Sequence, residues 1–351
     1  EDPVPLMRTY LISEKHIEEN ELVELEKIWS EEISEAANAA LAAEKLDPSK
    51  VSLSPYSDNV ERNLPPFQAD DCTPVQAIRS ALDHALEYDK DIILLGEDIG
   101  ELGGPFKTTK GLFEKYGRER IIDMPLAESG FSGFAIGAAE MGLRPVIEMQ
   151  FSDFSTDAVT QLGVNGGTYY FRTGRSLPLT VRMPTGGGLS FGPFHSQDLE
   201  GLFGTFPGLK IVYPSFVEDY FSLLLATIYD DNPVLFFESK YLHRRIKGNI
   251  RFDGKVESLN GGRIVRQGSD VSILSYGAMM HEVIAAADNA EKEMGISVEI
   301  IDPRILKPFD RELLIESVSK THRLLIVHES WQACSIGTWI ISNIPEEVFF
   351  E

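Results

Sequence analysis

Short aliphatic runs alternate with helical patterns from residue 74 onward, and this alternation limits the fold more than any other feature of the chain. Thr73, Pro74 and Gln76 form a capping-box pattern that begins the first helix. The aliphatic runs that follow have the length of strands and lie at residues 92–95, 145–149, 179–183, 210–212 and 234–237. Because such strands with helices between them form parallel sheets covered on both faces, we predict an α/β domain.

The same alternation resumes after Gly254 and predicts a second α/β domain. Its strands are expected at residues 271–275, 297–301 and 324–327, with a helix at 281–294. A further helix is expected to begin near Ile336, shortly before the sequence stops at Glu351.

The first seventy residues have a different character. Residues 16–45 place apolar side chains at helical spacing with glutamates between them, which predicts a long amphipathic helix. The apolar positions are Leu22, Leu25, Ile28, Trp29, Ile33 and Ala36. Residues 46–70 contain several prolines and few large aliphatic side chains, which is typical of an extended linker. We therefore divide the chain into domains at 1–70, 71–250 and 251–351.

Composition excludes several classes of protein. The 351 residues carry a formal net charge of −23, which disfavours nucleic acid and anionic membranes as partners and is compatible with a basic protein partner. No apolar run is long enough to span a bilayer, and the N-terminus lacks a signal-peptide pattern, so we expect a cytoplasmic location. Cys72 and Cys334 are the only cysteines, and we expect reduced thiols.

One carboxylate, Glu128, opens a run of glycine, alanine and serine between two apolar segments. Small residues at positions 130, 132, 133, 135 and 137–139 allow a helix to press closely against backbone or a ligand. We therefore expect this run to be enclosed rather than solvated, with Glu128 entering a tight interior where acid or base chemistry is done. The alternative is a glutamate that only stabilises the start of a helix through the helix dipole.

Four segments in the right order resemble the beta subunit of the thiamine diphosphate-dependent 2-oxo-acid dehydrogenases. They read LLGEDIG at 94–100, GPFKTTKGLFEKYGRERIIDMP at 104–125, PFHSQDLEGLF from Pro193 and DNPVLFFESKYLHR from Asp231. The resemblance extends from about Asp71 to the C-terminus. It implies a parallel-sheet, pyrimidine-binding domain of the transketolase type, followed by a transketolase C-terminal-type domain. Because family members usually continue further, the resemblance also implies that this C-terminal domain is incomplete in the sequence.

The helical N-terminal extension resembles the C-terminal tail of the family's alpha subunit. That likeness implies a fused alpha–beta chain whose alpha part is mostly missing from this sequence. The alternative is an N-terminal arm peculiar to this chain.

The resemblance also implies the cofactor thiamine diphosphate and assigns residues to it. Glu128 matches the glutamate that hydrogen-bonds the aminopyrimidine ring, and His195 matches the histidine that handles the substrate and passes the acyl group to a lipoyl arm. Leu126, Gln150 and Phe154 match positions beside the pyrimidine, where an aromatic ring at Phe154 could stack. Glu97 matches a further acidic position near the cofactor. Without the resemblance, three of these residues have a simpler explanation. Phe154 could be an ordinary core residue, Glu97 a turn residue at the end of a strand, and His195 a structural histidine.

The resemblance also implies two metal ions, magnesium and potassium. The family's magnesium-diphosphate motif lies on the alpha region, and the Asp253–Lys255 segment does not match it, so we expect magnesium to be bound by that region and the chain to be inactive alone. A structural potassium ion is implied at the matching positions Leu179, Thr227, Asp230 and Asn232. A helix-to-strand turn explains the same residues without any metal.

The resemblance implies a place in a 2-oxo-acid dehydrogenase complex. The expected reaction is decarboxylation of a branched-chain substrate, 3-methyl-2-oxobutanoate, as in branched-chain amino acid catabolism, with pyruvate as the alternative. The expected partners are an alpha region or subunit, a second copy of this chain in an alpha2-beta2-like heterotetramer, and the dihydrolipoyl acyltransferase core. A piece used mainly for docking to that core, or a transketolase or deoxyxylulose-phosphate synthase relative, are the other readings.

Overall fold

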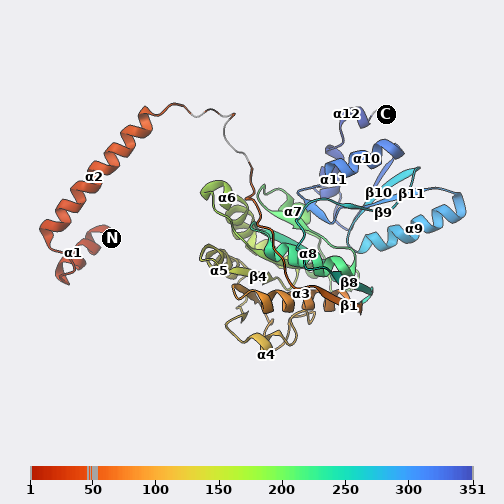
Figure 1. Cartoon of the computed structure of the whole chain (residues 1–351), viewed down its shortest axis with the longest axis horizontal. Coiled ribbons are helices and arrows are strands. Elements are labelled where there is room, and N and C mark those ends of the chain that lie inside the picture. Colours follow the sequence, from red (N-terminus) through yellow and green to blue (C-terminus); the bar gives the residue numbers. More distant parts are fainter. Residues whose placement is uncertain (1, 46, 48, 50–53, 350–351) are drawn as a thin grey trace. The chain divides into compact units, whose positions relative to one another are not determined.

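The computed structural model describes residues 2–45, 47, 49 and 54–349, which belong to two units at Glu1–Leu53 and Ser54–Glu351 (Figure 1). The first unit contains the helices α1 (Pro3–Ser13) and α2 (Glu19–Ala42). Arg8 of α1 forms ion pairs with Glu19 at 3.8 Å and with Glu26 at 3.4 Å. These pairs join the two helices of this unit.

The long helix predicted at 16–45 is confirmed as α2, with slightly narrower bounds. Of its predicted apolar stripe only Leu22 is buried, whereas Ile28, Trp29 and Ile33 are exposed. Residues 46, 48 and 50–53 of the predicted linker lie outside the described residues. The linker prediction was wrong at its far end, because a strand begins at Phe67 and pairs with a strand much later in the chain.

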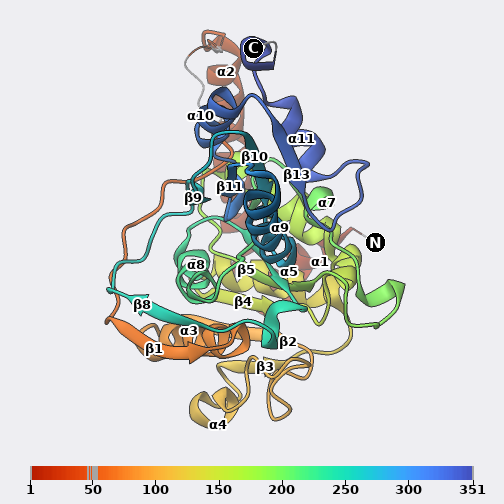
Figure 2. The ribbon, with the colours of Figure 1, turned by 90° about the vertical axis from the view of Figure 1, so that its right-hand side faces the viewer.

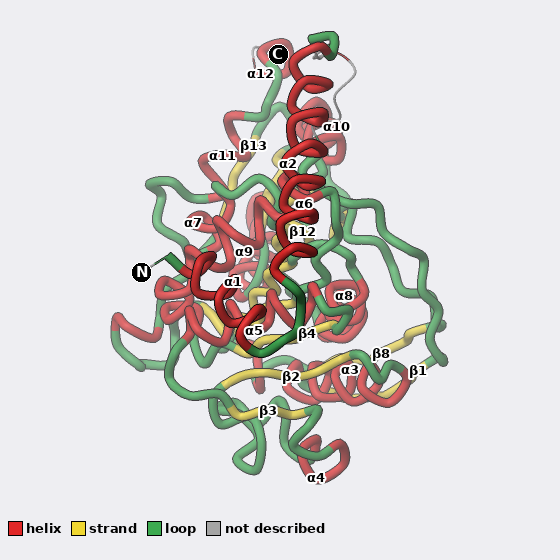
Figure 3. The backbone as a smooth tube through the Cα atoms, turned by 90° about the vertical axis from the view of Figure 1, so that its left-hand side faces the viewer, coloured by secondary structure: helices red, strands yellow, loops and turns green. Residues whose placement is uncertain are grey.

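The second unit is built on a seven-stranded sheet in the order β12-β6-β7-β5-β4-β2-β3. All neighbours are parallel except β12 and β6, and Figure 3 shows β2, β3 and β4 as adjacent strands. The strands are β2 (Ile92–Gly96), β3 (Ile121–Asp123), β4 (Arg144–Glu148), β5 (Thr180–Thr185), β6 (Lys210–Val212), β7 (Val234–Ser239) and β12 (Ile305–Lys307).

Helices cover both faces of this sheet, as its aliphatic strands require. Side chains alternate between the faces: Ile92 and Leu94 of β2 point to one, and Ile93 and Leu95 to the other. The first face is covered by α3 (Pro74–Tyr88) and α8 (Val217–Tyr229) together with the antiparallel pair β1 (Phe67–Cys72) and β8 (Gly248–Phe252), as Figure 2 shows.

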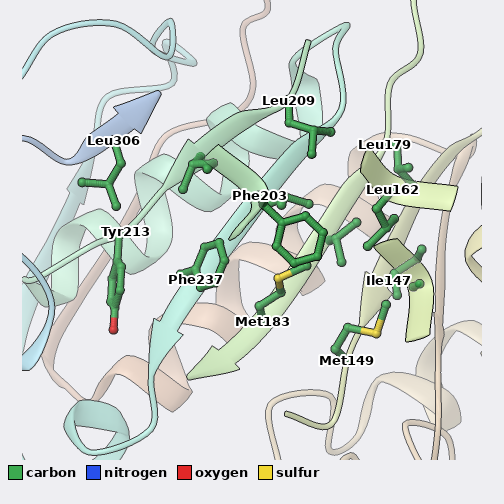
Figure 4. Packing of buried hydrophobic residues seen from close by; sticks show 14 of the residues in the cluster. Ile147, Met149, Leu162, Leu179, Met183, Phe203, Leu209, Tyr213, Phe237 and Leu306 are labelled. Carbon is green, nitrogen blue, oxygen red and sulfur yellow. The ribbon is translucent and has the colours of Figure 1, made fainter. Parts of the chain in front are cut away.

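The second face is covered by short helices and by the C-terminal region. The short helices are α5 (Glu128–Glu140), the 3-10 helix η2 (Ser152–Ala158), the π-helix η3 (Thr160–Gly166), α6 (Gly167–Thr173) and α7 (Glu200–Gly204). In Figure 4, Met183 of β5 packs against Phe203 of α7, with Phe237 and Tyr213 beside them. This core continues into the C-terminal sheet through Leu274 and Ile301, so the two sheets share it.

The C-terminal sheet has the order β13-β10-β11-β9, with β9 antiparallel and the others parallel. Its strands are β9 (Arg263–Arg266), β10 (Val271–Ser275), β11 (Val298–Asp302) and β13 (Leu324–Val327). The remaining helices are α4 (Leu112–Tyr116), η4 (Pro193–His195), η5 (Leu242–Arg244), α9 (Ala278–Met294), α10 (Arg311–Thr321), α11 (Ile336–Ser342) and α12 (Glu346–Phe349).

The predicted parallel α/β architecture is confirmed, and so are all eight predicted strands, to within a residue or two at their ends. The capping box also forms: Thr73 N–H donates to Gln76 Oε1 at 2.8 Å, and Gln76 N–H donates to Thr73 Oγ1 at 3.4 Å. The strands that the sequence did not predict are β1, β3, β8, β9 and β12. They are short or polar and lie at sheet edges or in the two-stranded pair.

A buried arginine ties the three central strands together. Arg182 of β5 forms ion pairs with Glu148 of β4 and with Glu238 of β7, and its Nε lies 2.6 Å from Glu238 Oε1. All three side chains are buried, and Nε2 of His243 lies 3.3 Å from Glu238. Burial alone would raise the pKa of the Glu238 carboxyl, but Arg182 and His243 hold it below its usual value.

Replacing Arg182 by methionine should lower the free energy of unfolding by about 3–5 kcal/mol, because two buried carboxylates lose their counter-charge. Urea unfolding followed by circular dichroism measures the effect. Arg251→Met is the matched control: its pair with Asp70 is half exposed, so the loss should stay below about 1 kcal/mol. Equal losses in the two variants would contradict this role of Arg182.

Candidate active site

The carboxyl ends of four neighbouring strands bring the predicted site residues into one row. Glu128 follows β3, Glu97 follows β2, Gln150 follows β4 and His195 follows β5, and these strands are adjacent in the order β3-β2-β4-β5. In open parallel sheets this edge is where ligands bind. Residues that are almost one hundred positions apart in sequence are therefore gathered at one edge by strand order alone.

Two carboxylates stand at one end of the row. Glu97 is buried, and neither oxygen of its carboxylate has a hydrogen-bond partner among the residues that the structure describes. Burial, and next the charges of Glu128 and Asp98, raise the pKa of Glu97 to about 7. Glu128 is half-buried at the N-terminus of α5. The pair provides a carboxyl group that is poised to exchange a proton near neutral pH.

Gln150 joins this acidic group. Its Nε2 donates to Oδ2 of Asp98 at 3.3 Å, and Asp98 adopts a left-handed backbone conformation with φ of 58°. Sequence reasoning did not single out Asp98. The signal that could have found it is its position directly after Glu97 at the end of a buried strand.

His195 lies among aromatic rings. Its imidazole meets Phe151 edge-on at 4.5 Å between ring centroids and Phe154 at 5.4 Å. Phe151 also contacts the rings of Phe106 at 5.6 Å and Phe191 at 6.0 Å. The predicted residues Phe154 and His195 therefore come together, and Phe151 is the residue between them that sequence reasoning missed.

The expectation that the small-residue run is enclosed was wrong for one side of α5. Phe131, Ala135 and other residues of this helix are buried, but Gly130 is exposed, Phe134 is 53% exposed, and a Cβ added at Gly137 would meet nothing within 4 Å. The small residues pack α5 against the sheet on one side only. Within the described part of the chain, nothing covers the other side.

Leu126, shortly before the start of α5, is an apolar residue that nothing in the described part of the chain covers. Its side chain is 82% exposed, two positions before Glu128. Met141, at the far end of α5, is 85% exposed. Exposed apolar side chains thus stand at both ends of α5, which is typical of a surface that another molecule covers.

The residues expected to hold potassium do cluster, but the one carboxylate among them is already fully hydrogen-bonded. Oδ2 of Asp230 accepts hydrogen bonds from Lys210 Nζ and Asn59 Nδ2, both at 2.7 Å, and Oδ1 accepts two from Asn232 at 2.9 Å. The carbonyl of Leu179 accepts the N–H of Val234. The Asp230 carboxylate is therefore saturated, and the ammonium of Lys210 already supplies the positive charge.

Several expectations from composition can be compared directly. Cys72 and Cys334 are free thiols. No helix in the described residues has both the length and the apolarity needed to cross a membrane. No group of three or more histidine, cysteine, aspartate or glutamate side chains in the described ranges could hold a metal ion.

Comparison with known proteins bears on this site. Residues 72–245 match the family model of the transketolase pyrimidine binding domain, and residues 261–351 match that of the transketolase C-terminal domain. The chain is 41% identical over 279 residues to the 2-oxoisovalerate dehydrogenase subunit beta of Bacillus subtilis, covering 79% of this chain and 85% of that protein. The chain belongs to the beta-subunit family of the 2-oxo-acid dehydrogenases.

A second relative of this beta-type chain is the pyruvate dehydrogenase E1 component subunit beta of Staphylococcus aureus. It is 37% identical over 276 residues, covering 78% of this chain and 85% of that protein. Among solved structures, a split-gene transketolase described as an inactive beta4 tetramer matches with a TM-score of 0.59 at 23% identity, covering 78% of this chain and 85% of that one. That likeness concerns the fold alone.

Replacing Glu97 by glutamine should change how stability depends on pH. A carboxyl with a folded pKa of about 7 binds a proton that the unfolded chain releases above about 4.5, so the parent loses stability as pH rises between these values. Glutamine cannot ionise and lacks this loss. The difference in unfolding free energy, variant minus parent, should therefore be about 1–3 kcal/mol more favourable at pH 8 than at pH 5.

Urea unfolding at both pH values provides the measurement. Glu101→Gln, at an exposed position a few residues on, is the control and should show no such change. A Glu97→Gln difference that is the same at pH 5 and pH 8 would mean that Glu97 is not held in its protonated form.

Proposed function

We propose that this chain is the beta half-site of a thiamine diphosphate-dependent 2-oxo-acid dehydrogenase that decarboxylates 3-methyl-2-oxobutanoate and passes the acyl group to a lipoyl arm. One observation carries this proposal: the buried carboxyl of Glu97, with no hydrogen-bond partner in the described residues, stands beside Glu128 at an open edge of the sheet. An unpaired buried carboxyl is costly, so this arrangement is explained by a ligand that supplies the missing partner.

The residues present fit the pyrimidine end of the cofactor. Thiamine diphosphate, when bound, supplies the electron sink that lets carbon dioxide leave a 2-oxo acid. In our proposal Glu128 hydrogen-bonds the aminopyrimidine ring and holds the proton that shifts its tautomer. Glu97, the neighbour of Glu128, can take up that proton and return it, because its pKa of about 7 allows both protonation states near neutral pH. Gln150, Phe154 and Leu126 orient the ring.

His195 acts at the substrate end of the row in this proposal. Its imidazole can donate a proton from one ring nitrogen to the substrate oxygen and support acyl transfer to the lipoyl arm. The rings of Phe151 and Phe154 fix the imidazole at 4.5 Å and 5.4 Å and exclude water from its sides. An imidazole held between two rings loses little freedom when the substrate arrives.

A second polypeptide region must complete this site. The exposed Leu126, Phe134 and Met141, which lie on α5 and directly beside its ends, support docking of an alpha region there, which would bring the diphosphate and magnesium site. The N-terminal helices, which resemble an alpha-subunit tail, fit a fused alpha–beta chain. We further propose an alpha2-beta2-like assembly and docking to a basic domain of the acyltransferase core, which suits the net charge of −23.

The proposed preference for 3-methyl-2-oxobutanoate over pyruvate is based on the aromatic side chains near His195. Phe106, Phe151, Phe154 and Phe191 make it apolar, which favours a branched aliphatic substrate over a smaller one. Each methylene in such a pocket is worth only about 1–3 kcal/mol, and the relatives at 41% and 37% identity act on different substrates by name. Pyruvate is therefore the second candidate.

Glu128→Gln in the enzyme reconstituted with its alpha region should lower the rate of decarboxylation at least 100-fold, because the glutamine amide cannot exchange the proton. Release of carbon dioxide from a labelled 2-oxo acid measures this rate. Binding of the variant to the acyltransferase core should persist. Glu140→Gln, at the exposed end of the same helix, is the control with parental activity. A fully active Glu128→Gln enzyme would remove Glu128 from the chemistry and leave docking as the main role.

Reduction of an artificial electron acceptor should be faster with 3-methyl-2-oxobutanoate than with pyruvate, by roughly 10-fold or more in kcat/KM. Phe151→Ala should narrow this ratio, because it removes the ring that contacts both His195 and Phe154. The opposite order of the two substrates would assign the enzyme to the pyruvate type.

A further inference from the structure

The loop at residues 186–198, which carries His195, is held at its two ends and open in the middle. Its central residues Phe191 and Phe194 are 48% and 75% exposed. At its base, the N–H of Gly186 donates to the carbonyl of Gln197 at 3.2 Å. The position of the imidazole therefore depends on whatever fixes these two ends.

Three carboxylates from different parts of the chain fix them. Glu329, which follows β13 in the C-terminal region, accepts the N–H of Gly187. Asp153 of η2 accepts the N–H of Gln197 at 3.2 Å. Asp198, at the end of the loop, accepts the hydroxyl of Thr185 at 2.8 Å and that of Tyr213 at 3.2 Å.

Close contact confirms that Glu329 belongs to this anchor. A Cβ added at Gly186 would lie 2.9 Å from Oε2 of Glu329, and Gly186 has a φ of +85°. Both the close approach and the left-handed backbone require glycine here. Ser330, the next residue, donates to the carbonyl of Asp198 at 3.2 Å, so the C-terminal region contacts both ends of the loop.

Burial, and next the charge of Glu200, raise the pKa of Asp198, and burial raises that of Glu329. A positive charge nearby favours the ionised forms of these acids, and Lys240 provides one. Lys240 follows β7, is 2% exposed, and donates its backbone N–H to the carbonyl of Thr185 at 3.1 Å, directly below the loop. Burial lowers the pKa of its ammonium to about 8, and the charges of Asp153, Asp198 and Glu329 oppose that shift.

The ammonium of Lys240 has no direct hydrogen-bond partner among the described residues. It lies 5.5 Å from the centroid of the Phe151 ring, the same ring that meets His195 edge-on. A buried amine without a hydrogen bond is costly, so simple packing does not explain a lysine here. The charges of Asp153, Asp198 and Glu329, which act on this ammonium, do explain it.

We propose that Lys240 is a positioning residue for His195: its buried ammonium favours the ionised forms of Asp153, Asp198 and Glu329, which accept the hydrogen bonds at the two ends of the 186–198 loop, and so keeps both ends pinned. This inference rests on the proposed role of His195 in the reaction. It adds a function for the C-terminal region, which supplies one of the three anchors.

The charges around this cluster set its dependence on pH. The other titratable groups packed against the three carboxylates are Glu200, Tyr213, Tyr276 and His328. Burial raises the pKa of both tyrosines and lowers that of His328, so these three are neutral near pH 8. A lysine with a lowered pKa is charged below about 8, and the loop should therefore be held below that pH and loosen above it.

Hydrogen–deuterium exchange of the 351-residue chain, with and without its alpha partner, tests the inference without relying on activity. In Lys240→Met at pH 7, the amides of Gly186, Gly187 and Gln197 should exchange at least 5-fold faster, while those of β2 and α8 keep the parental rate. Lys240→Arg should restore slow exchange and abolish the loosening above pH 8. Lys247→Met, at an exposed lysine, is the control.

Glu329→Ala provides a second test at an exposed residue, where folding is not at stake. It should speed exchange at Gly187 and leave Gln197, which Asp153 holds, unchanged. Parental exchange at the three loop amides in folded Lys240→Met, or at Gly187 in Glu329→Ala, would overturn the proposal. A loosened loop with undiminished acyl transfer would support the anchor and contradict the proposed role of His195 instead.

Discussion

The buried Arg182, shared between Glu148 and Glu238, is the interaction on which the geometry of this beta-type chain depends. It joins the three central strands near the edge where the site residues emerge. Buried ion pairs contribute little net stability, but a misaligned neighbour leaves a charge uncompensated. A slip in register between β4, β5 and β7 would break the ion pairs of Arg182 with Glu148 and Glu238. It would therefore cost more free energy than the loss of apolar packing alone.

Register matters because the site is a property of the sheet edge rather than of any one segment. Glu128, Glu97, Gln150, His195 and Lys240 follow β3, β2, β4, β5 and β7, which are five consecutive strands of the sheet. Each strand delivers one polar side chain to the same edge. The acidic side chains lie at one end of this row, and His195 with its aromatic neighbours lies at the other. A ligand bound along the edge would therefore contact both groups.

Sequence predicted the sheet well because buried parallel strands are continuous aliphatic runs, and residues 92–95, 210–212 and 271–275 need no tertiary context to be recognised. It missed β9, whose Arg263 and Arg266 are held by ion pairs with distant aspartates, and β12, which is three residues long. Site residues were found through the resemblance. Lys240 was not found, because nothing in the local sequence shows that its ammonium will be buried without a direct hydrogen-bond partner among the described residues. Asp98 was not found either, although it directly follows Glu97.

The run of small residues after Glu128 shows why a close packing surface can be misread. Glycine and alanine were expected to mean enclosure, yet one side of α5 packs on the sheet and the other, with Gly130, Phe134 and Gly137, is open. The oxygens of Glu97, which have no hydrogen-bond partner in the described part of the chain, lie beside Glu128, and this uncovered surface begins at Glu128. Among the described residues, then, a buried acid without a hydrogen-bond partner and an apolar surface without cover lie at the same place. One ligand bound beneath one docked chain would supply both the partner and the cover.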